Sequence, residues 1–403
     1  MRVLICGGGV IGASVAYFLG CRGVEAVVIE RLAPAAAASG KSGGFLALDW
    51  CDGTPLAPLA RRSFALHADL VQRIAGDWGY RRLTTYGGVS GRRQRNRHRG
   101  NGYAIDWLSP EVTVNHRLGS PDTTAQVHPQ RFTEAMMRAA QAQGAHLRLG
   151  NVTGLLRRNG GTQVTGVEID GDAIDGDAVV IAMGPWSILC AQWVPLPGVY
   201  GLKGHSLVFE TGTSVPAEAL FLEYVEGKGA VQTPELFPRT DGTTYVCAIS
   251  SEAPLPINPS EVVPDPGALE RLEGICREMS PVLASAKIVA RQACYRPITQ
   301  DGLPLIGRIP GVEGGFAATG HSVWGILNAP ATGEAIADLI IDGAARSVDL
   351  RRFDPGRLPP LDPARLRITE AKKLAPIFRL RHRRSFVNHS RPGGIRAQAR
   401  RRP

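Results

Sequence analysis

The sequence has no apolar run long enough to span a lipid bilayer, although 44% of its 403 residues are hydrophobic. Its seven cysteines are an odd number and are scattered along the chain, and no two of them form a Cys-x-x-Cys pair. That distribution is typical of a reducing compartment and argues against a zinc site, so we expect no bound metal. A β-like run begins almost at Met1, with no basic and apolar segments before it. We therefore expect no secretory signal and a soluble, cytoplasmic protein.

Acidic residues are almost absent from the end of the chain. From Arg365 to Pro403 there are thirteen lysines and arginines and one acidic residue, Glu370, so this segment has a net charge of +12. Because the whole chain carries +10, the residues before Arg365 carry −2, and the overall basicity says little about an active site. We expect residues 359–403 to form a basic tail that is disordered or holds one loose helix. The tail is either solvated or in contact with an anionic membrane surface.

A nucleic-acid reader module is lacking as well. Residues 91–100 hold five arginines without apolar periodicity, a pattern that favours a solvated surface loop. No recognisable reader motif accompanies them, so we expect no nucleic-acid partner.

The first thirty residues do carry a complete structural unit. Val3–Ile5 and Val27–Ile29 are short apolar runs typical of buried parallel strands. Between them a helix is expected to begin near Val10, with its free N–H groups and positive dipole end directed at a bound anion. Glu30 follows the second strand, where a carboxylate accepts hydrogen bonds from an adenosine ribose and repels the 2′-phosphate of NADP.

The turn between the first strand and the helix has the spacing G-x-G-x-x-G. Gly7 permits the tight turn, Gly9 lets the backbone approach a pyrophosphate, and Gly12 lets the helix pack closely on the strand. The spacing lies in a strand–turn–helix–strand–acid unit of the expected length, which predicts dinucleotide binding.

The rest of the chain changes its period near Val199. Before this point, apolar periodicity predicts helices and buried strands, one of which ends at Gly184, where ligands of such sheets lie. After it, short β-like segments separated by Gly, Pro and Asp predict an antiparallel sheet. The expected fold class is α/β, with a Rossmann-type nucleotide-binding domain and a second, mainly antiparallel β domain for the substrate. The expected helices are 56–78, 129–142, 268–279 and 329–341, and the expected strands are 146–152 (in the dinucleotide sheet), 177–183, 207–210, 219–225, 229–232 and 243–250.

Two further motifs lie far apart in the chain. Residues 38–50 read Ala-Ser-Gly-Lys-Ser-Gly-Gly-Phe-Leu-Ala-Leu-Asp-Trp, a loop that taken alone is also compatible with a flexible linker. Residues 296–307 read Arg-Pro-Ile-Thr-Gln-Asp-Gly-Leu-Pro-Leu-Ile-Gly, and residues 320–326 read Gly-His-Ser-Val-Trp-Gly-Ile. Together with the nucleotide-binding unit, these motifs resemble the FAD-dependent D-amino-acid oxidase and glycine oxidase family, and most of all a fungal and plant branch of it. The resemblance extends over residues 1–358 and is weak at 80–118 and 205–290.

The resemblance implies FAD as the cofactor. It places the loop of residues 39–45 close to the flavin and the backbone near Val152 at the adenine. The helix after the Gly320 turn points its N-terminus at partial negative charge on the flavin. The residues expected to bind the cofactor are Gly7, Gly9, Val10, Ile11, Gly12, Glu30, Arg31, Ser39, Ser42, Gly43, Gly44, Phe45, Val152, Gly184, Trp186, Gly320, His321, Trp324, Gly325 and Ile326.

Arg296 is the charged residue that the resemblance makes most informative. Its guanidinium can hold a carboxylate through two hydrogen bonds, and in glycine oxidase-like members the corresponding arginine binds the substrate carboxylate. A structural salt bridge is the alternative. Tyr245 either lines the substrate cavity or packs at a strand position, and His321 completes the expected catalytic set. Val323 stands where glycine oxidase carries a further arginine, which argues against a simple glycine or D-amino-acid substrate.

Cys294 lies seven residues before Asp301. In monomeric sarcosine oxidase, a cysteine at that offset is joined to the flavin through a thioether. The alternative is a small buried core residue, which is how free cysteines commonly behave, and we therefore expect non-covalent FAD.

These observations predict a two-domain flavoprotein enzyme. We expect an FAD-binding domain of residues 1–80, 119–200 and 292–358, a substrate domain of residues 81–118 and 201–291, and the tail 359–403. The expected activity is oxidation of the C–N bond of an amino acid or secondary amine, with hydride transfer to flavin N5 and oxygen or another electron acceptor. The alternatives are a flavin dehydrogenase that reduces a quinone or protein, and a non-catalytic flavin-binding scaffold. The oligomeric state stays open.

Overall fold

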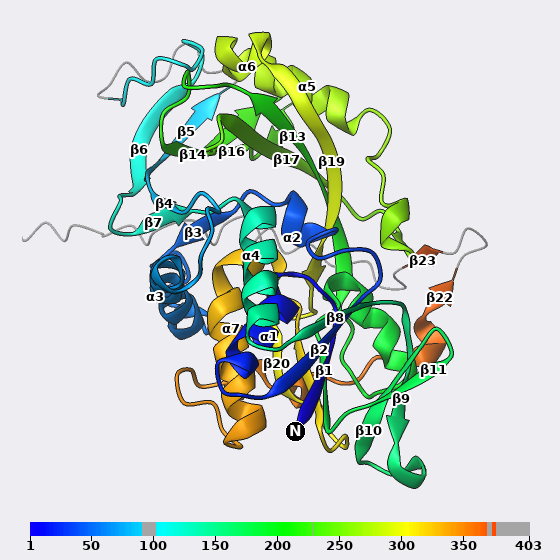
Figure 1. Cartoon of the computed structure of the whole chain (residues 1–403). Coiled ribbons are helices and arrows are strands. Elements are labelled where there is room, and N and C mark those ends of the chain that lie inside the picture. Colours follow the sequence, from blue (N-terminus) through cyan, green and yellow to red (C-terminus); the bar gives the residue numbers. More distant parts are fainter. Residues whose placement is uncertain (91–101, 228, 369–372, 376–403) are drawn as a thin grey trace, which may run out of the picture.

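Two β-sheets, one mainly parallel and one mainly antiparallel, organise the chain (Figure 1). The computed structural model describes residues 1–90, 102–227, 229–368 and 373–375. The arginine-rich segment 91–100, which the sequence predicts to be a surface loop, therefore lies outside the described residues. In Figure 1 the parallel sheet lies in the lower half and the antiparallel sheet in the upper half. Strands β13 and β19 run from the upper sheet toward the lower one and connect the two parts.

The parallel sheet is built around β1, which is paired on one side with β2 and on the other with β12. Its strand order is β20-β21-β12-β1-β2-β8, and only the edge strand β20 is antiparallel to its neighbour. Both faces of the central strands β1, β12 and β21 are covered, which is why these strands are almost continuously apolar, whereas the edge strand β8 is not. The strands are β1 (Arg2–Cys6), β2 (Glu25–Glu30), β8 (His146–Leu149), β12 (Ala178–Ile181), β20 (Leu305–Arg308) and β21 (Gly315–Thr319).

Helices cover one face of this sheet, and smaller elements cover the other. The side chains of Val3 and Ile5 pack against the helices, whereas those of Leu4 and Cys6 pack against a three-stranded sheet and a 3₁₀ segment. The helices are α1 (Val10–Gly20), α3 (Ala57–Arg73), α4 (Pro129–Ala142) and α7 (Gly325–Ile341). The smaller elements are β9 (Val152–Arg157), β10 (Val164–Ile169), β11 (Asp172–Asp175) and the 3₁₀ segment η3 (Gly184–Gln192).

The antiparallel sheet has the strand order β19-β13-β17-β16-β14-β5-β6, and β15 pairs with β14 at one side. One parallel pair, β14 with β5, interrupts the antiparallel pattern. Helices α5 (Ala268–Met279) and α6 (Pro281–Ser285) bury one face of the sheet. Its strands are β5 (Thr84–Ser90), β6 (Thr113–Gly119), β13 (Tyr200–Glu210), β14 (Glu218–Val225), β15 (Val231–Gln232), β16 (Glu235–Pro238), β17 (Thr243–Ser251) and β19 (Lys287–Ile298).

Short elements complete the described chain. They are α2 (Ala38–Lys41), the strands β3 (Phe45–Ala47), β4 (Arg81–Arg82) and β7 (Thr124–Gln126), and the strands β18 (Leu255–Pro256), β22 (Arg367–Ile368) and β23 (Lys373–Ala375). Strand β23 pairs with both β18 and β22, so the described part of segment 359–403 contains strands instead of the expected disorder or loose helix. The remainder of that segment lies outside the described residues. Within the described ranges, no helix is both long and apolar enough to cross a membrane.

Several expected helix and strand boundaries are wrong, and one expected domain boundary falls within a strand. Val152 does not continue β8, because Gly150 and Asn151 turn the chain into β9 of the separate three-stranded sheet. Helix α3 ends at Arg73 instead of residue 78. Strand β19 continues to Ile298, across the expected domain boundary at residue 292. Only residues 231–232 of the expected strand 229–232 form a strand.

Helix α7 begins at Gly325, four residues before its expected start, and contains Pro330. Proline has no N–H and leaves the carbonyl four residues earlier without its helical donor. Here α3 supplies the missing partners. His67 Nε2 donates to the Ile326 oxygen at 3.0 Å and to the Leu327 oxygen at 3.2 Å. The Ala331 N–H donates to Ser63 Oγ at 3.0 Å.

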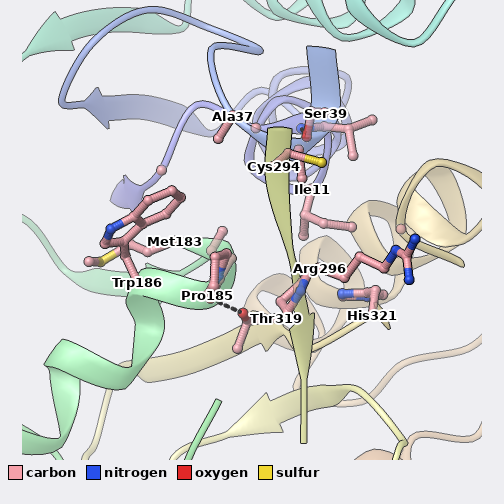
Figure 2. A pocket seen from close by; sticks show the side chains of 18 of the residues that line it. Ile11, Ala37, Ser39, Met183, Pro185, Trp186, Cys294, Arg296, Thr319 and His321 are labelled. Atoms are coloured by element: carbon pink, nitrogen blue, oxygen red, sulfur yellow. Dashed lines mark hydrogen bonds between the residues drawn. The ribbon is translucent and has the colours of Figure 1, made fainter. Parts of the chain in front are cut away.

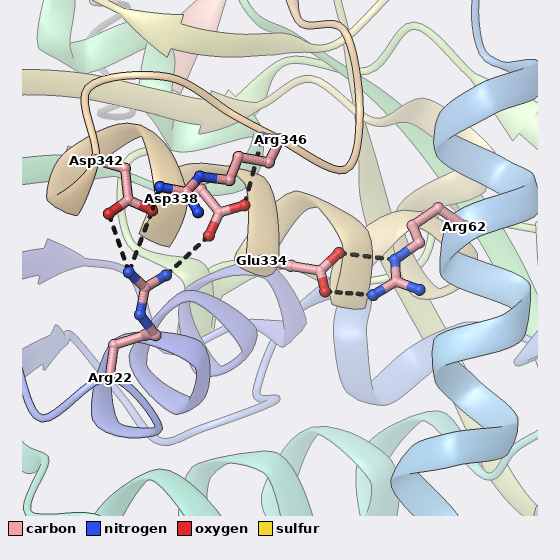
Figure 3. Close-up of polar contacts among 6 residues, drawn as sticks. All are labelled: Arg22, Arg62, Glu334, Asp338, Asp342 and Arg346. Atoms are coloured by element: carbon pink, nitrogen blue, oxygen red, sulfur yellow. Dashed lines mark hydrogen bonds and ion pairs between the residues drawn. The ribbon is translucent and has the colours of Figure 1, made fainter.

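Ion pairs hold the solvent side of α7 to its neighbours (Figure 3). Arg22, just after α1, donates to Asp338 at 3.1 Å and to Asp342 at 3.0 Å. Arg62 of α3 donates to both carboxylate oxygens of Glu334. The helix that leads away from the turn at residues 320–324 is therefore fixed from two sides.

Candidate functional site

The turn after β1 is formed by backbone atoms in very close contact. Gly7 has φ +114°, and a Cβ there would lie 2.4 Å from the Ala182 oxygen of the neighbouring strand connection. A Cβ on Gly12 would lie 2.0 Å from the Gly7 oxygen. A Cβ on Gly9, by contrast, would have only Ser39 Oγ nearby, at 3.1 Å, and would otherwise project into the cavity. Gly7 and Gly12 are required by contacts within the protein, whereas Gly9 leaves room for a ligand.

Glu30 at the end of β2 holds the other side of this turn. One of its carboxylate oxygens accepts from the Gly8 N–H at 2.7 Å, and the other accepts from the Leu32 N–H at 3.0 Å. The carboxylate also lines the cavity, in the position from which it can accept hydrogen bonds from ribose hydroxyls.

The segment after Glu30 is attached to the helix start and to distant loops. Ser39 Oγ accepts from the Val10 N–H, the first of the helix, at 2.9 Å. Arg31 donates to the Asn151 side chain and to the Ile257 carbonyl oxygen, and burial lowers the pKa of its guanidinium. Trp186 Nε1 donates to the neighbouring Pro256 oxygen at 2.8 Å. The nucleotide end of the cavity is thus enclosed by residues from four separate parts of the chain.

A second tight turn follows β21. Gly320 has φ +80°, and the following 3₁₀ turn (Ser322–Trp324) leads directly into the N-terminus of α7. His321 is 4% exposed, and its Nε2 lies 3.0 Å from Thr332 Oγ1. Burial lowers the pKa of His321 to about 3, so its imidazole is neutral at neutral pH. The uncapped N–H groups at the start of α7 face the cavity and suit negative charge.

The cavity-facing side of the antiparallel sheet contributes charged and polar side chains. Arg296 of β19 donates from Nη1 to Ser250 Oγ of β17 at 3.2 Å. Burial disfavours its charge, but the surrounding Cys247 and Glu235 side chains keep the pKa of the guanidinium above its ordinary value. The Tyr245 ring is 5% exposed, and burial raises the pKa of its hydroxyl.

Arg239 links this sheet to the loop of residues 39–45. Its guanidinium donates to the Ser42 oxygen at 3.0 Å and lies 5.3 Å from the centroid of the Tyr245 ring. Phe237 stacks on Tyr245 at a centroid distance of 6.1 Å, and Gly43 lies against Phe237 so closely that a Cβ would be 2.2 Å from the ring. The loop is therefore packed tightly against the antiparallel sheet on this side of the cavity.

Most residues expected from the sequence line this one cavity. Figure 2 shows Trp186 and Met183 toward one side of it and Arg296 and His321 toward the other. The expected residues in its wall are Gly7, Gly9, Val10, Ile11, Glu30, Arg31, Ser39, Ser42, Gly43, Val152, Gly184, Trp186, Tyr245, Cys294, Arg296, Gly320, His321, Gly325 and Ile326.

Four residues expected to bind the cofactor do not line it. Gly12 packs beneath the turn, and Gly44 has φ +82° and lies against the Val127 oxygen. The Phe45 ring joins an aromatic cluster with Trp50, Phe221 and Phe237. Trp324 packs against the core around α7. Each of them supports the wall from behind.

The structure adds residues that the sequence analysis missed. Glu235 of β16, Cys247 of β17 and His205 of β13 all line the cavity. Glu235 and Phe237 share one face of β16 and Leu236 lies on the other, but a strand of four residues is too short for this pattern to be identified from the sequence. Within the described ranges, no group of three or more His, Cys, Asp or Glu residues could hold a metal ion.

The residues present fit a flavin dinucleotide. Ser42 Oγ and His321 Nδ1 are buried in the cavity wall and have no hydrogen-bond partner within the described part of the protein. The open side of Gly9, the helix start beside it and the Glu30 carboxylate match a pyrophosphate and a ribose. The unpartnered atoms and the start of α7 lie where a polar ring edge would satisfy them.

Known proteins of one family resemble this chain. A family model described as FAD dependent oxidoreductase (DAO) matches residues 2–339. An oxidoreductase of Schizosaccharomyces pombe is 29% identical in an alignment that covers 88% of this chain and 97% of that protein. A glycine oxidase of Pseudomonas aeruginosa is 28% identical over 89% of this chain and 99% of its own length. The crystal structure of glycine oxidase from Geobacillus kaustophilus matches with a TM-score of 0.72 and 25% identity, over 89% of this chain and 99% of that one.

Proposed function

Because this chain belongs to the DAO family of FAD-dependent oxidoreductases, we propose that it oxidises the C–N bond of a small amine or amino acid that carries a carboxylate. The observation that supports this proposal is the position of Arg296. Its half-buried guanidinium lies in the wall of the same cavity as the Gly7–Gly9 turn and the start of α7. A cation that is always charged, held at that point, selects for an anionic group on the substrate.

FAD, when bound, supplies the electron sink that accepts a hydride from the carbon next to nitrogen. Arg296 holds the substrate carboxylate with two N–H groups, which fixes the orientation of that carbon. The N–H groups at the start of α7 stabilise negative charge at the edge of the site. His321 contributes no charge, because its buried imidazole is neutral. The imine product is hydrolysed by water.

The test is anaerobic reduction of the bound flavin by a panel of amino acids and N-methyl amino acids, measured from the loss of the visible flavin absorbance. Arg296→Met is expected to lower kcat/KM for carboxylate substrates by about 30-fold or more, because a charged group loses its partner in the site. The matched control is Arg291→Met on the same strand, since Arg291 is exposed and pairs with Glu273 outside the cavity. An unchanged KM in Arg296→Met, with FAD content also unchanged, would contradict the assigned role.

The same preparation identifies the electron acceptor and tests the alternatives. We propose oxygen as the acceptor, so that air reoxidises the reduced flavin within the turnover time. Reoxidation by a quinone but not by air would assign a dehydrogenase instead. A flavin that no amine reduces would support a non-catalytic flavin-binding protein. Precipitation with acid tests the attachment of FAD, which we propose is non-covalent, because burial raises the pKa of the Cys294 thiol and disfavours its reactive thiolate.

A further inference from the structure

The cavity contains a second charged side chain that the proposed mechanism does not use. Glu235 of β16 lies on the same face of the antiparallel sheet as Arg296, but three strands away in the order β19-β13-β17-β16. Neighbouring strands are about 4.8 Å apart, so β19 and β16 are about 14 Å apart across the sheet. Gln292 is the β19 residue level with Glu235, and Arg296 lies four residues farther along that strand. Both side chains are long enough to extend toward the space between them.

Small residues occupy the two strands between these charges. Gly204 of β13 has no side chain, and a Cβ there would lie 3.1 Å from Arg296 Nη2. Cys247 of β17 is opposite Ser206 in the sheet and directly beside Glu235. The side chains between Arg296 and Glu235 are therefore short. Together they form a groove on the sheet surface, called the trough below, with Arg296 at its positive end and Glu235 at its negative end.

Neither end makes a direct ion pair within the described part of the protein. Arg296 donates to the neutral hydroxyl of Ser250, and Glu235 accepts a weak S–H hydrogen bond from Cys247, at 3.5 Å. Among the described residues, no cationic nitrogen lies within 4.0 Å of the Glu235 carboxylate. Burial raises the pKa of this carboxyl, although Arg296 and the Cys247 thiol oppose the rise. A buried carboxylate with no cation in direct contact is unfavourable, and a cationic ligand beside it would offset the cost of its burial.

The length of the trough follows from the strand that crosses it. Ser250 marks the Arg296 end and Cys247 marks the Glu235 end. They are three residues apart on β17 and lie opposite Gly204 and Ser206, which are two residues apart on β13, so the two markers are about 7–10 Å apart along the sheet. This span suits an amino acid with a side chain of the length of lysine or arginine. The Tyr245 ring, which lines the cavity and is backed by Phe237, offers an apolar surface for the methylene groups of such a side chain.

We propose, building on the function proposed above, that Glu235 forms a cation-binding subsite opposite Arg296. The preferred substrate class is then an amino acid with a second positive charge, in which Arg296 holds the carboxylate and Glu235 holds the distal ammonium or guanidinium. Glu235 is in this assignment a specificity-determining residue and takes no part in hydride transfer.

The experiment compares cationic substrates with uncharged ones of similar length. Both enantiomers of lysine, ornithine and arginine are tested against norleucine and methionine, with anaerobic flavin reduction of the holoenzyme as the measurement. The wild-type protein is expected to prefer the cationic member of each pair by about tenfold to a hundredfold in kcat/KM, as for a charge-assisted hydrogen bond in a partly desolvated site. Glu235→Gln is expected to bring this ratio close to one, while kcat/KM for the uncharged substrates changes by less than about threefold.

Glu223→Gln is the matched control, because Glu223 is exposed on the adjacent strand β14. It is expected to leave the ratio unchanged. A wild-type protein that oxidises uncharged amino acids as well as cationic ones, or a Glu235→Gln protein that keeps the preference, would overturn the proposal. If Glu235→Gln loses FAD or does not fold, the wild-type comparison alone decides. Failure of every substrate to reduce the flavin would instead refute the proposed function, which is a different result.

Discussion

The two walls of the cavity are made in different ways. The nucleotide end consists mainly of backbone: Gly7 and Gly12 lie so close to neighbouring carbonyl oxygens that no side chain fits. The substrate end consists of side chains from four strands, with Arg296 and Glu235 at its limits. The first wall depends on a rigid backbone geometry with almost no tolerance. The second depends on which side chains the strand register brings onto one face, and it can change its chemistry without changing the fold.

The largest predicted effect tests the intolerance of the backbone wall. In Gly12→Ala the new methyl group would lie 2.0 Å from the Gly7 oxygen, a clash with backbone that no rotamer can relieve. We expect purified protein with little or no bound FAD and a loss of several kcal/mol of stability, or no soluble protein. The measurements are the flavin-to-protein absorbance ratio and the urea midpoint.

Gly274→Ala is the control for this change. Gly274 is exposed within α5 and has open space around its Cβ position, so alanine is expected to be neutral or to stabilise by about 0.4–1 kcal/mol. A Gly12→Ala protein with a normal flavin content would show that the two walls do not differ as described.

Acid is expected to weaken the helical side of the nucleotide wall. Burial lowers the pKa of His67 to about 4, from an ordinary value of 6.5. Below pH 6.5 the unfolded chain binds a proton that the folded protein excludes, so the stability contributed by neutral His67 is complete above pH 6.5 and is lost as the pH falls. The loss reaches about 3 kcal/mol near pH 4, at 1.36 kcal/mol per pKa unit.

His67→Gln removes this titration and retains an N–H donor for the carbonyls of α7. Its free energy of unfolding is therefore expected to fall less steeply between pH 6.5 and pH 4 than that of the wild-type protein, in urea titrations at several pH values. Equal slopes for the two proteins would contradict the assigned pKa. Burial also lowers the pKa values of His321 and His128, so part of the pH dependence of stability remains in both proteins.

A smaller effect is expected from a glycine of the substrate wall. Gly204→Ala would place a methyl group 3.1 Å from Arg296 Nη2, the mobile end of a long side chain that can move by a few tenths of an ångström. We expect normal FAD content, and KM for carboxylate substrates raised by about threefold to tenfold, equivalent to about 1 kcal/mol. Loss of FAD in this variant would mean that the substrate wall is as intolerant as the nucleotide wall.

The smallest effect concerns the outer surface, away from both walls. The Arg62–Glu334 pair joins α3 to α7, but the Arg62 side chain is 39% exposed, so solvent screens it. A double-mutant cycle with Arg62→Met and Glu334→Gln is expected to give a coupling energy of about 0.2–1 kcal/mol that decreases at high salt. A coupling above about 2 kcal/mol would assign this pair a larger part in fixing α7.

The contrast between the walls also explains what sequence reasoning could reach. Gly7, Gly9 and Glu30 were predictable, because a backbone-built site imposes a short local pattern. Arg296 was found because it lies in a long motif of the resembled family. Glu235 lies in no such motif. Its position in the cavity depends on the register in which β16 pairs with β17, which sets Glu235 beside Cys247 and which the sequence does not reveal.

Errors in the predicted cofactor set have a similar origin. Gly44 and Phe45 belong to the correct loop, but a strand follows at once and directs them away from the cavity. The family resemblance assigned the whole loop to the flavin, but it does not say which residues of the loop face the cavity. The early start of α7 was missed because Pro330 normally marks a helix boundary, and its compensation comes from α3, more than 250 residues earlier in the sequence.

The hydrogen bonds from α3 that compensate for Pro330 make three positions depend on one another. Pro330 removes the N–H that would donate to the Ile326 carbonyl, and His67 donates to that carbonyl instead. Ser63 accepts the N–H of Ala331, the residue after the proline. A lineage that loses the proline regains an ordinary helical N–H for the Ile326 carbonyl and releases His67 from selection. A lineage that keeps the proline has to retain a donor at position 67. Substitutions at these positions should therefore co-vary among related chains, although they are far apart in sequence and none of the three binds substrate.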